Sequence, residues 1–340
     1  MEEHREAFAN EADGHKGAEM SKAQGFRKWE LRWSIAAIAL SVTISLWGCN
    51  NSEKVREAMG PKEFVSPPSA AQAVYNAAKA ADTNAIMAIF GPDAKEYLVS
   101  ENPEQDKTTL QQFAGDFEQM HRWAPAENDE LVLTVGVESY PFPFPLMKTA
   151  DGQWAFNSAR GMKEIEARKI GENELTVIDV LNEMADAQVE YYKTTHDGSK
   201  VKQYAQRFTS SEGKHDGLYW KVGEGEPESP LGPLAARANT EGYQPGTKEA
   251  PAPFHGYFYQ ILKEQGTHAE GGAKSYIVNA NMTRGFAFLA YPAEYRRSGV
   301  MTFLIGQDGR VYQKDLGADT VETAKGIKGF DPDETWQIVE

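Results

Sequence analysis

Apolar residues recur every three or four positions in much of the first half of the chain, and every second position in several later segments. The first spacing predicts helices, because a turn holds 3.6 residues and the apolar side chains then share one face. Helices are predicted over residues 69–81, 84–90, 107–122, 162–169 and 173–195. Alternation and short apolar runs predict strands, whose successive side chains point to opposite faces. Strands are predicted over residues 131–137, 146–148, 153–156, 255–262, 285–290, 300–305 and 310–316.

Turn and capping residues limit these segments. Ser69 and Asp82 are predicted N-caps, because a side-chain oxygen there accepts a hydrogen bond from a free backbone N–H. Gly171 is predicted to separate two helices, and residues 306–309 are predicted to close a hairpin, since Asp-Gly tolerates positive φ. Residues 229–254 are predicted to form a loop rich in glycine and proline. The helix after Gly171 has one apolar stripe, made of Leu175, Ile178, Leu181, Ala185, Gln188 and Tyr192.

The order of these segments predicts an α+β fold with two domains, residues 69–172 and 173–340. The first, with helices followed by a curved antiparallel sheet, resembles the cone-shaped fold of nuclear transport factor two and ketosteroid isomerase. The second, with one long helix on an antiparallel sheet, resembles the globular head of type IV pilins and pseudopilins. The apolar stalk helix of a pilin is missing, so polymerisation of that kind is not implied. Fold alone assigns no function.

A cone of the first kind either holds a ligand or is filled by its own side chains. The polar candidates for a pocket in it are Asp93, Asp116, His121 and Asp129. Their spacing favours none of them as a catalytic acid or base. A working pocket and a filled scaffold are therefore both kept as hypotheses.

An apolar run begins near Ile35 and follows three basic side chains at residues 27–32. Basic, apolar and small residues in this order are typical of a secretory signal, and the run is shorter than the ~20 residues that span a bilayer. The run ends at Leu46-Trp47-Gly48-Cys49, which resembles a bacterial lipobox in which Cys49 receives diacylglycerol. Trp47 stands where the lipobox prefers a small residue. The alternatives are an uncleaved anchor and a buried core helix.

This pattern predicts a signal region, residues 1–48, and a lipidated flexible tether, residues 49–68. Met20 opens a signal of ordinary length, so we expect translation to begin there, with residues 1–19 as an extension or a disordered preface. By the sorting rule of enterobacterial lipoproteins, Asn50 in place of aspartate favours the outer membrane. We therefore expect a lipid-anchored envelope protein that faces the periplasm, on the outer membrane rather than the inner one.

Composition narrows the classes of partner. The 340 residues carry a formal net charge of −15, which argues against nucleic acid, because its phosphates repel an acidic surface. Cys49 is the single cysteine, so no disulfide forms within one chain. The sequence contains no HExxH, paired-histidine, GxGxxG or P-loop pattern, so no metal, nucleotide or other cofactor is expected. Membrane contact is expected through the lipid alone.

Polar and aromatic residues gather most densely in two segments of the last third of the chain. Recognition surfaces commonly combine Trp and Tyr with a few charged neighbours. The candidate binding residues are Lys214, His215, Asp216, Tyr219, Trp220, His255 and Tyr257, with Tyr259 beside them. The segments are interpreted as a contact for an envelope protein or glycan, or as structural, with Trp220 and Tyr257 filling the interface between sheet and helix.

The main functional alternative is an envelope hydrolase or small-ligand-binding enzyme that uses His215 and His255, or the cone pocket. A serine nucleophile needs a positioned base, and Ser210, Ser211 and Ser229 are the serines of these segments. No GxSxG pattern surrounds them, and no catalytic residue is assigned. A binding or assembly module is the preferred hypothesis, and a passive structural lipoprotein is a third.

Eight short motifs occur along the part of the chain that follows the tether. They are PFPL at 143–146, RKIGENEL at 168–175, AQVEY at 187–191, DGLYW at 216–220, SPLG at 229–232, HGY at 255–257, GFA at 285–287 and VMTF at 300–303. In combination they resemble the bacterial family catalogued as domain of unknown function 2950, with a departure before Met282, where a glycine is expected. The resemblance implies export from a bacterium with two membranes. It carries over no activity, because the family has none assigned.

Overall fold

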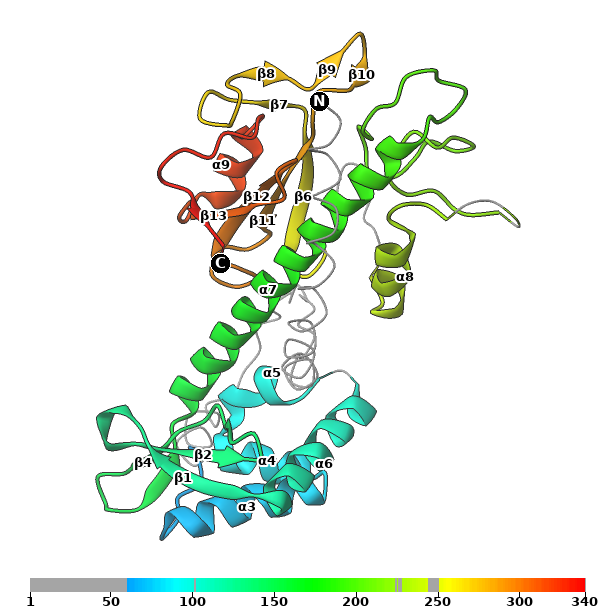
Figure 1. The fold of residues 1–340 in the computed structure, drawn as a ribbon. Coiled ribbons are helices and arrows are strands. Elements are labelled where there is room, and N and C mark those ends of the chain that lie inside the picture. The colour runs from blue at the N-terminus through cyan, green and yellow to red at the C-terminus, as the bar shows by residue number, and fades with distance from the viewer. Residues whose placement is uncertain (1–59, 101, 224, 226–227, 244–250, 340) are drawn as a thin grey trace, which may run out of the picture. The chain divides into compact units, whose positions relative to one another are not determined.

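The computed structural model describes residues 60–100, 102–223, 225, 228–243 and 251–339, and it confirms the α+β class. The described residues divide into two compact units, unit 1 up to Ala167 and unit 2 from Arg168, and their limit falls inside helix α7 (Ser158–Lys193) (Figure 1). Each unit has its own hydrophobic core. The predicted signal region, Cys49 and the first part of the tether lie outside the described residues.

Unit 1 consists of helices followed by an antiparallel sheet. The helices are α3 (Pro67–Lys79), α4 (Thr83–Phe90), the 3₁₀ turn Pro92–Ala94, α5 (Lys95–Leu98) and α6 (Pro103–Gln119). The strands are β1 (His121–Pro125), β2 (Leu131–Val135), β3 (Tyr140–Pro141), β4 (Leu146–Lys148) and β5 (Trp154–Phe156), in the order β1-β2-β4-β5 with β3 paired to β2. The predicted β4–β5 hairpin is confirmed, with Leu146 opposite Phe156.

The core of unit 1 is filled by phenylalanine side chains from both its helices and its sheet. The Phe90 ring lies 4.5 Å from that of Phe144, 5.0 Å from Phe156 and 5.8 Å from Phe142, centroid to centroid. All four side chains are buried. Tilted aromatic pairs at these distances are favourable beyond the area that they bury. Such packing is what a filled scaffold requires.

The first helix of unit 1 begins earlier than the sequence suggests. Ser66, and not Ser69, is its N-cap, and the two side chains form a capping box at the start of α3. Before it, Phe64 is buried and exchanges backbone hydrogen bonds with Trp154 at 2.7 and 2.8 Å. The end of the predicted tether is therefore part of the folded unit. The Asp82 cap of α4 is confirmed, since its side chain accepts from the Ala85 N–H at 3.0 Å.

The helix predicted to reach residue 122 ends at Gln119. Met120 is extended, and His121 already pairs with Val135 in the register of β1 and β2. The apolar spacing of the helix runs on into the strand, so periodicity alone does not mark the change. Pairing with β2 satisfies the backbone groups that a longer helix would otherwise bond, and this decides the boundary.

Unit 2 combines the second part of α7 with an antiparallel sheet in the order β14-β13-β12-β11-β6. These strands are β6 (Tyr257–Leu262), β11 (Ala287–Pro292), β12 (Met301–Gly306), β13 (Val311–Asp315) and β14 (Gln337–Ile338). The ladders β7 (Glu264–Gln265) with β8 (Lys274–Ser275), and β9 (Ile277–Val278) with β10 (Asn281–Met282), adjoin it, and the helices are α8 (Gly232–Thr240) and α9 (Thr320–Gly326). The hairpin predicted around residues 306–309 is confirmed by the pairing of β12 and β13.

Helix α7 is continuous, so the predicted break at Gly171 is wrong. Glycine lowers helix stability by only about 1 kcal/mol, which packing on both sides of it outweighs. The buried face of α7 in unit 2 overlaps the predicted stripe, since Leu181, Ala185 and Gln188 are buried, but it also includes Val177 and Val180, while Leu175 is 61% exposed. Apolar spacing thus indicated the helix and part of the face that enters the core.

Helix α8 lies in the segment predicted to be a loop. Proline normally breaks a helix. In the first turn, however, the backbone N–H groups have no partner within the helix, so a proline there removes no hydrogen bond. Leu234 and Ala238, four residues apart, are buried on one face of α8. Arg237 forms two hydrogen bonds with the Glu183 carboxylate of α7, at 2.8 and 2.9 Å.

Among the described residues, no helix has the length and apolar character needed to cross a membrane.

Candidate functional site

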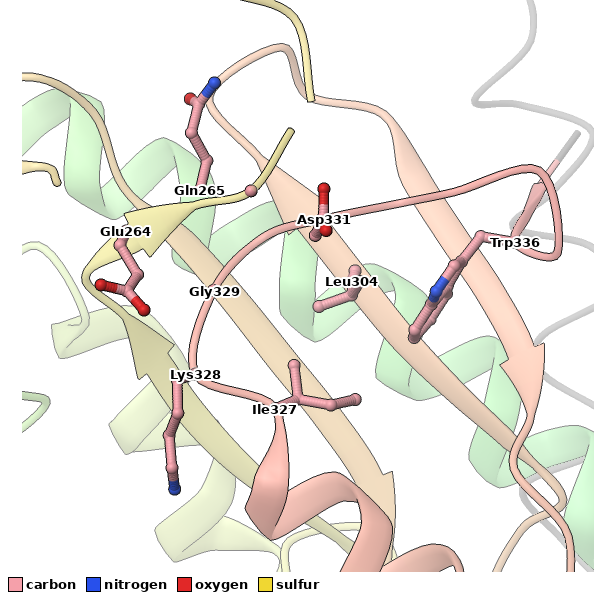
Figure 2. A pocket seen from close by; sticks show the side chains of 9 residues that line it. Glu264, Gln265, Leu304, Ile327, Lys328, Gly329, Asp331 and Trp336 are labelled. Carbon is pink, nitrogen blue, oxygen red and sulfur yellow. The ribbon is translucent and has the colours of Figure 1, made fainter. Parts of the chain in front are cut away.

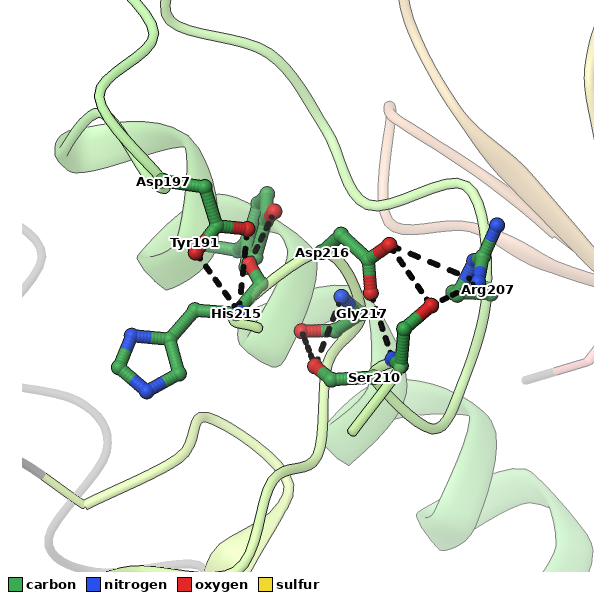
Figure 3. A network of polar contacts seen from close by, with 8 residues as sticks. Tyr191, Asp197, Arg207, Ser210, His215, Asp216 and Gly217 are labelled. Carbon is green, nitrogen blue, oxygen red and sulfur yellow. Dashed lines mark hydrogen bonds and ion pairs between the residues drawn. The ribbon is translucent and has the colours of Figure 1, made fainter. Parts of the chain in front are cut away.

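The predicted residues Lys214, His215, Asp216, Tyr219 and Trp220 lie in residues 207–220, a hydrogen-bonded segment that we call the platform. Figure 3 shows its polar contacts around His215 and Asp216. Its backbone folds back on itself, since the Ser210 N–H donates to the Tyr219 carbonyl at 2.8 Å. The Ser210 hydroxyl accepts from the Gly217 N–H at 2.9 Å. A side chain at Gly217 would lie 2.7 Å from the Ser210 nitrogen, so the turn requires glycine here.

Asp216 fixes the turn of the platform. Its carboxylate accepts hydrogen bonds from the Ser211 backbone at 2.7 Å and the Ser211 hydroxyl at 3.0 Å, and it lies 3.5 Å from Arg207. Burial raises the pKa of Asp216, but the Ser211 hydrogen bonds and the Arg207 charge outweigh it and lower that pKa from its ordinary value. Asp216 therefore serves the platform as a charged hydrogen-bond acceptor.

His215 is anchored through its backbone. Its N–H donates to the Asp197 carboxylate at 3.0 Å, and its carbonyl accepts from the Tyr191 hydroxyl of α7 at 2.7 Å. Burial and the charges of Asp197 and Asp216 raise the pKa of Tyr191 to about 12, so this hydroxyl stays protonated and donating. Figure 3 shows the imidazole pointing away from the other polar side chains of the network.

The His215 imidazole belongs to an aromatic group instead. It stacks on Trp220 with ring centroids 4.4 Å apart, and His196 lies 6.0 Å from the same indole. His196 in turn stacks on Tyr191 at 3.8 Å. Trp220 is 7% exposed, whereas Lys214 is exposed and Tyr219 half-buried. Composition and spacing did not mark His196 and Tyr191 as members of this group. Both lie within one helical turn of the end of α7, and this position was the signal that the sequence offered.

The second predicted segment, which contains His255 and Tyr257, is packed inside the protein. Tyr257 is fully buried, and its hydroxyl donates to the Met301 carbonyl at 2.9 Å. Its pKa is raised by burial and by the nearby Glu174. His255 Nε2 lies 3.0 Å from Glu241 Oε2, an ion-pair distance without hydrogen-bond geometry. Burial lowers the pKa of His255 although Glu241 raises it.

The two segments contact α7 at different levels. Gly256 lies against Asn173, whereas His215 contacts Tyr191. These α7 residues are 18 positions apart, which at 1.5 Å per residue is about 27 Å along the helix. His215 and His255 therefore do not share one site. Within the described residues, no group of three or more His, Cys, Asp or Glu side chains is placed to hold a metal ion.

Two of the four candidates of unit 1 have partners within the protein, and the other two are exposed. Asp116 is buried and accepts from the Gln112 amide at 3.0 Å. His121 stacks on Phe117 with ring centroids 3.7 Å apart. Asp93 and Asp129 are exposed. This arrangement supports the filled-scaffold hypothesis for unit 1.

Sequence reasoning did not identify a pocket of about 340 Å³ in unit 2 (Figure 2). Figure 2 shows residues 327–336 curving around Leu304, with Glu264 and Trp336 on opposite sides. The lining residues are Glu264, Gln265, Gly266, Leu304, Ile327, Lys328, Gly329, Asp331 and Trp336. They come from three segments far apart in the chain, so no local motif marks them.

Backbone hydrogen bonds fix the walls of this pocket. The Phe330 N–H donates to the Glu264 carbonyl at 2.9 Å, and the Gly266 N–H donates to the Phe330 carbonyl at 3.0 Å. A Cβ at Gly266 would lie 2.2–2.5 Å from the Asp331 carboxylate, so glycine alone lets that carboxylate pack there. Asp331 also accepts from the His268 N–H at 2.7 Å and lies 3.1 Å from its imidazole.

Residues 61–339 match the family described as "Protein of unknown function (DUF2950)". The chain belongs to this family. The match covers both units, as the sequence motifs predict. None of the curated proteins matches the chain, and no solved structure matches it. The likenesses of unit 1 to the nuclear transport factor two cone and of unit 2 to a pilin head stay predictions.

Proposed function

We propose that this DUF2950 protein is a binding module of the bacterial envelope, anchored by a lipid on Cys49. Its platform contacts a partner protein through Lys214, His215 and Tyr219. The supporting observation is the stacking of the His215 imidazole on Trp220, on a segment whose backbone is fixed by hydrogen bonds. A fixed aromatic surface with a cation beside it is typical of protein interfaces.

Rigidity favours this role because association loses affinity when loops must be ordered on binding. Asp216 and Asp197 hold the platform from two sides before any partner arrives. Tyr191 adds a hydrogen bond from α7, the longest element of the unit. The contact residues are thus held in place from the start, and a partner gains binding free energy without ordering them.

The same contacts weigh against a hydrolase at the platform. A serine nucleophile must donate its proton to a base within about 3 Å. The Ser210 hydroxyl bonds Gly217 and the Ser211 hydroxyl bonds Asp216, while the His215 ring stacks on Trp220. These hydroxyls shape a turn and do not form a nucleophile–base pair with His215.

The anchor is tested on the protein purified from its own host. We expect a mass that lacks residues 1–48 and carries diacylglycerol on Cys49, and we expect the chain in the membrane fraction, because two acyl chains anchor stably. Cys49→Ser is expected to move the chain out of that fraction. An unmodified chain that retains residues 1–48, or a Cys49→Ser variant that stays membrane-bound, would contradict the lipid anchor.

The partner contact is tested by photo-crosslinking in the host. A photoreactive residue at exposed Lys214 is expected to give a discrete adduct, whereas the same residue at exposed Lys163 of unit 1 serves as the matched control. His215→Ala is expected to reduce the adduct from position 214 several-fold, because it removes the ring stacked on Trp220. Equal adducts from both positions, or none from position 214, would refute the platform as the contact surface.

A further inference from the structure

We propose that the pocket of unit 2 binds a neutral sugar ring. The site is separate from the platform and does not depend on the partner proposed for it. At about 340 Å³ the pocket lies at the lower end of the 300–1,000 Å³ typical of small-molecule sites. That size suits one ring of a saccharide and not an extended peptide.

The pocket combines an apolar interior with a polar rim. Leu304 is fully buried at its base, and Ile327 and Trp336 complete the apolar lining (Figure 2). Glu264 and Asp331 supply carboxylates at the rim. A pyranose ring has the matching character, because one face presents C–H groups and its edge presents hydroxyls that donate hydrogen bonds to carboxylates.

The charges around the pocket favour a neutral ligand. Lys328 lines the pocket together with Glu264 and Asp331, so the rim carries charges of both signs. An anion would meet the two carboxylates, and a cation would meet the ammonium group. The Lys314 ammonium already lies 5.8 Å from the centre of the Trp336 ring. A cationic ligand would share that ring's negative face charge with Lys314, whereas a sugar C–H face needs no such charge.

The carboxylates differ in how they are held. Asp331 is fixed by the two His268 contacts and by its packing on Gly266. The Glu264 side chain is exposed, and within the described residues no hydrogen bond or ion pair engages its carboxylate. Glu264 is therefore the acceptor that a ligand hydroxyl can take without displacing a protein contact, which makes it the sharpest position to substitute.

The test is saturation-transfer difference NMR on the full-length chain with glucose, galactose and N-acetylglucosamine as neutral probes and choline as a cationic probe. We expect saturation of the C–H protons of at least one sugar and none of choline. Trp336→Ala is expected to abolish the signal. Glu264→Ala is expected to weaken binding about ten-fold, as the loss of a charged hydrogen bond does.

Glu270→Ala is the matched control, since this exposed glutamate follows Glu264 in the same connection and does not line the pocket. It should bind as the unsubstituted chain does. Glu264→Ala decides the question if Trp336→Ala does not fold, because Glu264 is exposed. Saturation of choline and not of the sugars, no saturation of any sugar, or equal binding by the Glu264→Ala and Glu270→Ala variants would each overturn the proposal.

Discussion

Gly161→Ala is expected to lower the free energy of unfolding by about 3 kcal/mol, at the upper end of the usual cost of overpacking a core. A Cβ at this position of α7 would lie 2.1 Å from the Phe144 ring. Phe144 is fully buried, and its ring packs against those of Phe90 and Phe142. The gain of about 1 kcal/mol that alanine brings to a helix interior is far smaller than the cost of this overlap.

Gly171→Ala, in the same helix, is the control and should have the opposite sign. Nothing lies within 4 Å of a Cβ at Gly171, so we expect about 1 kcal/mol of added stability from helix propensity alone. Equilibrium urea unfolding followed by circular dichroism measures both variants. Adding Phe144→Leu to Gly161→Ala should recover part of the loss. Equal effects at the two glycines would show that Gly161 does not pack against Phe144.

Gln188→Leu is expected to cost about 3 kcal/mol although it replaces a buried polar side chain with an apolar one of similar size. The Gln188 amide donates to the Ala205 carbonyl and accepts from the Ala205 N–H, both at 2.8 Å. Gln188 and Ala205 are buried, at 0% and 1% exposure. Leucine would leave two buried backbone groups without partners, at about 1–3 kcal/mol each.

The measurement is urea unfolding together with hydrogen exchange at the Ala205 amide, whose protection should fall. Gln72→Leu is the control, because the Gln72 amide bonds Asn76 on the exposed face of α3. We expect it to change stability by no more than about 0.5 kcal/mol. A Gln188→Leu variant of normal stability with a protected Ala205 amide would show that this pair does not hold the segment to α7.

Gln188 also shows what periodicity leaves undecided. Its position predicts a place on the apolar stripe of the helix, and the structure confirms that it is buried. Its role, however, depends on Ala205, which is 17 residues away and meets it only in the folded chain. Leu175 is the converse case, apolar in sequence and 61% exposed in the structure.

The candidate surface was found in part because its members are neighbours in the chain. Lys214, His215 and Trp220 lie within seven residues, so composition alone marks them. The pocket was missed because Gln265 and Phe330 meet across 65 residues. The composition of one segment cannot indicate a contact between residues so far apart in the chain.

Local interactions explain what the sequence determined by itself. Period, capping and turn chemistry act within a few residues, and they specified the α+β class, the Asp82 cap and the hairpins at 146–156 and 300–316. The sequence motifs also indicated the family, because they can be read without the fold. Tertiary structure decided the continuity of α7 through Gly171, the burial of Tyr257, the separation of His215 from His255 and the pocket beside Trp336. Each of these depends on contacts between distant segments, whose packing free energy exceeds the roughly 1 kcal/mol of local propensity.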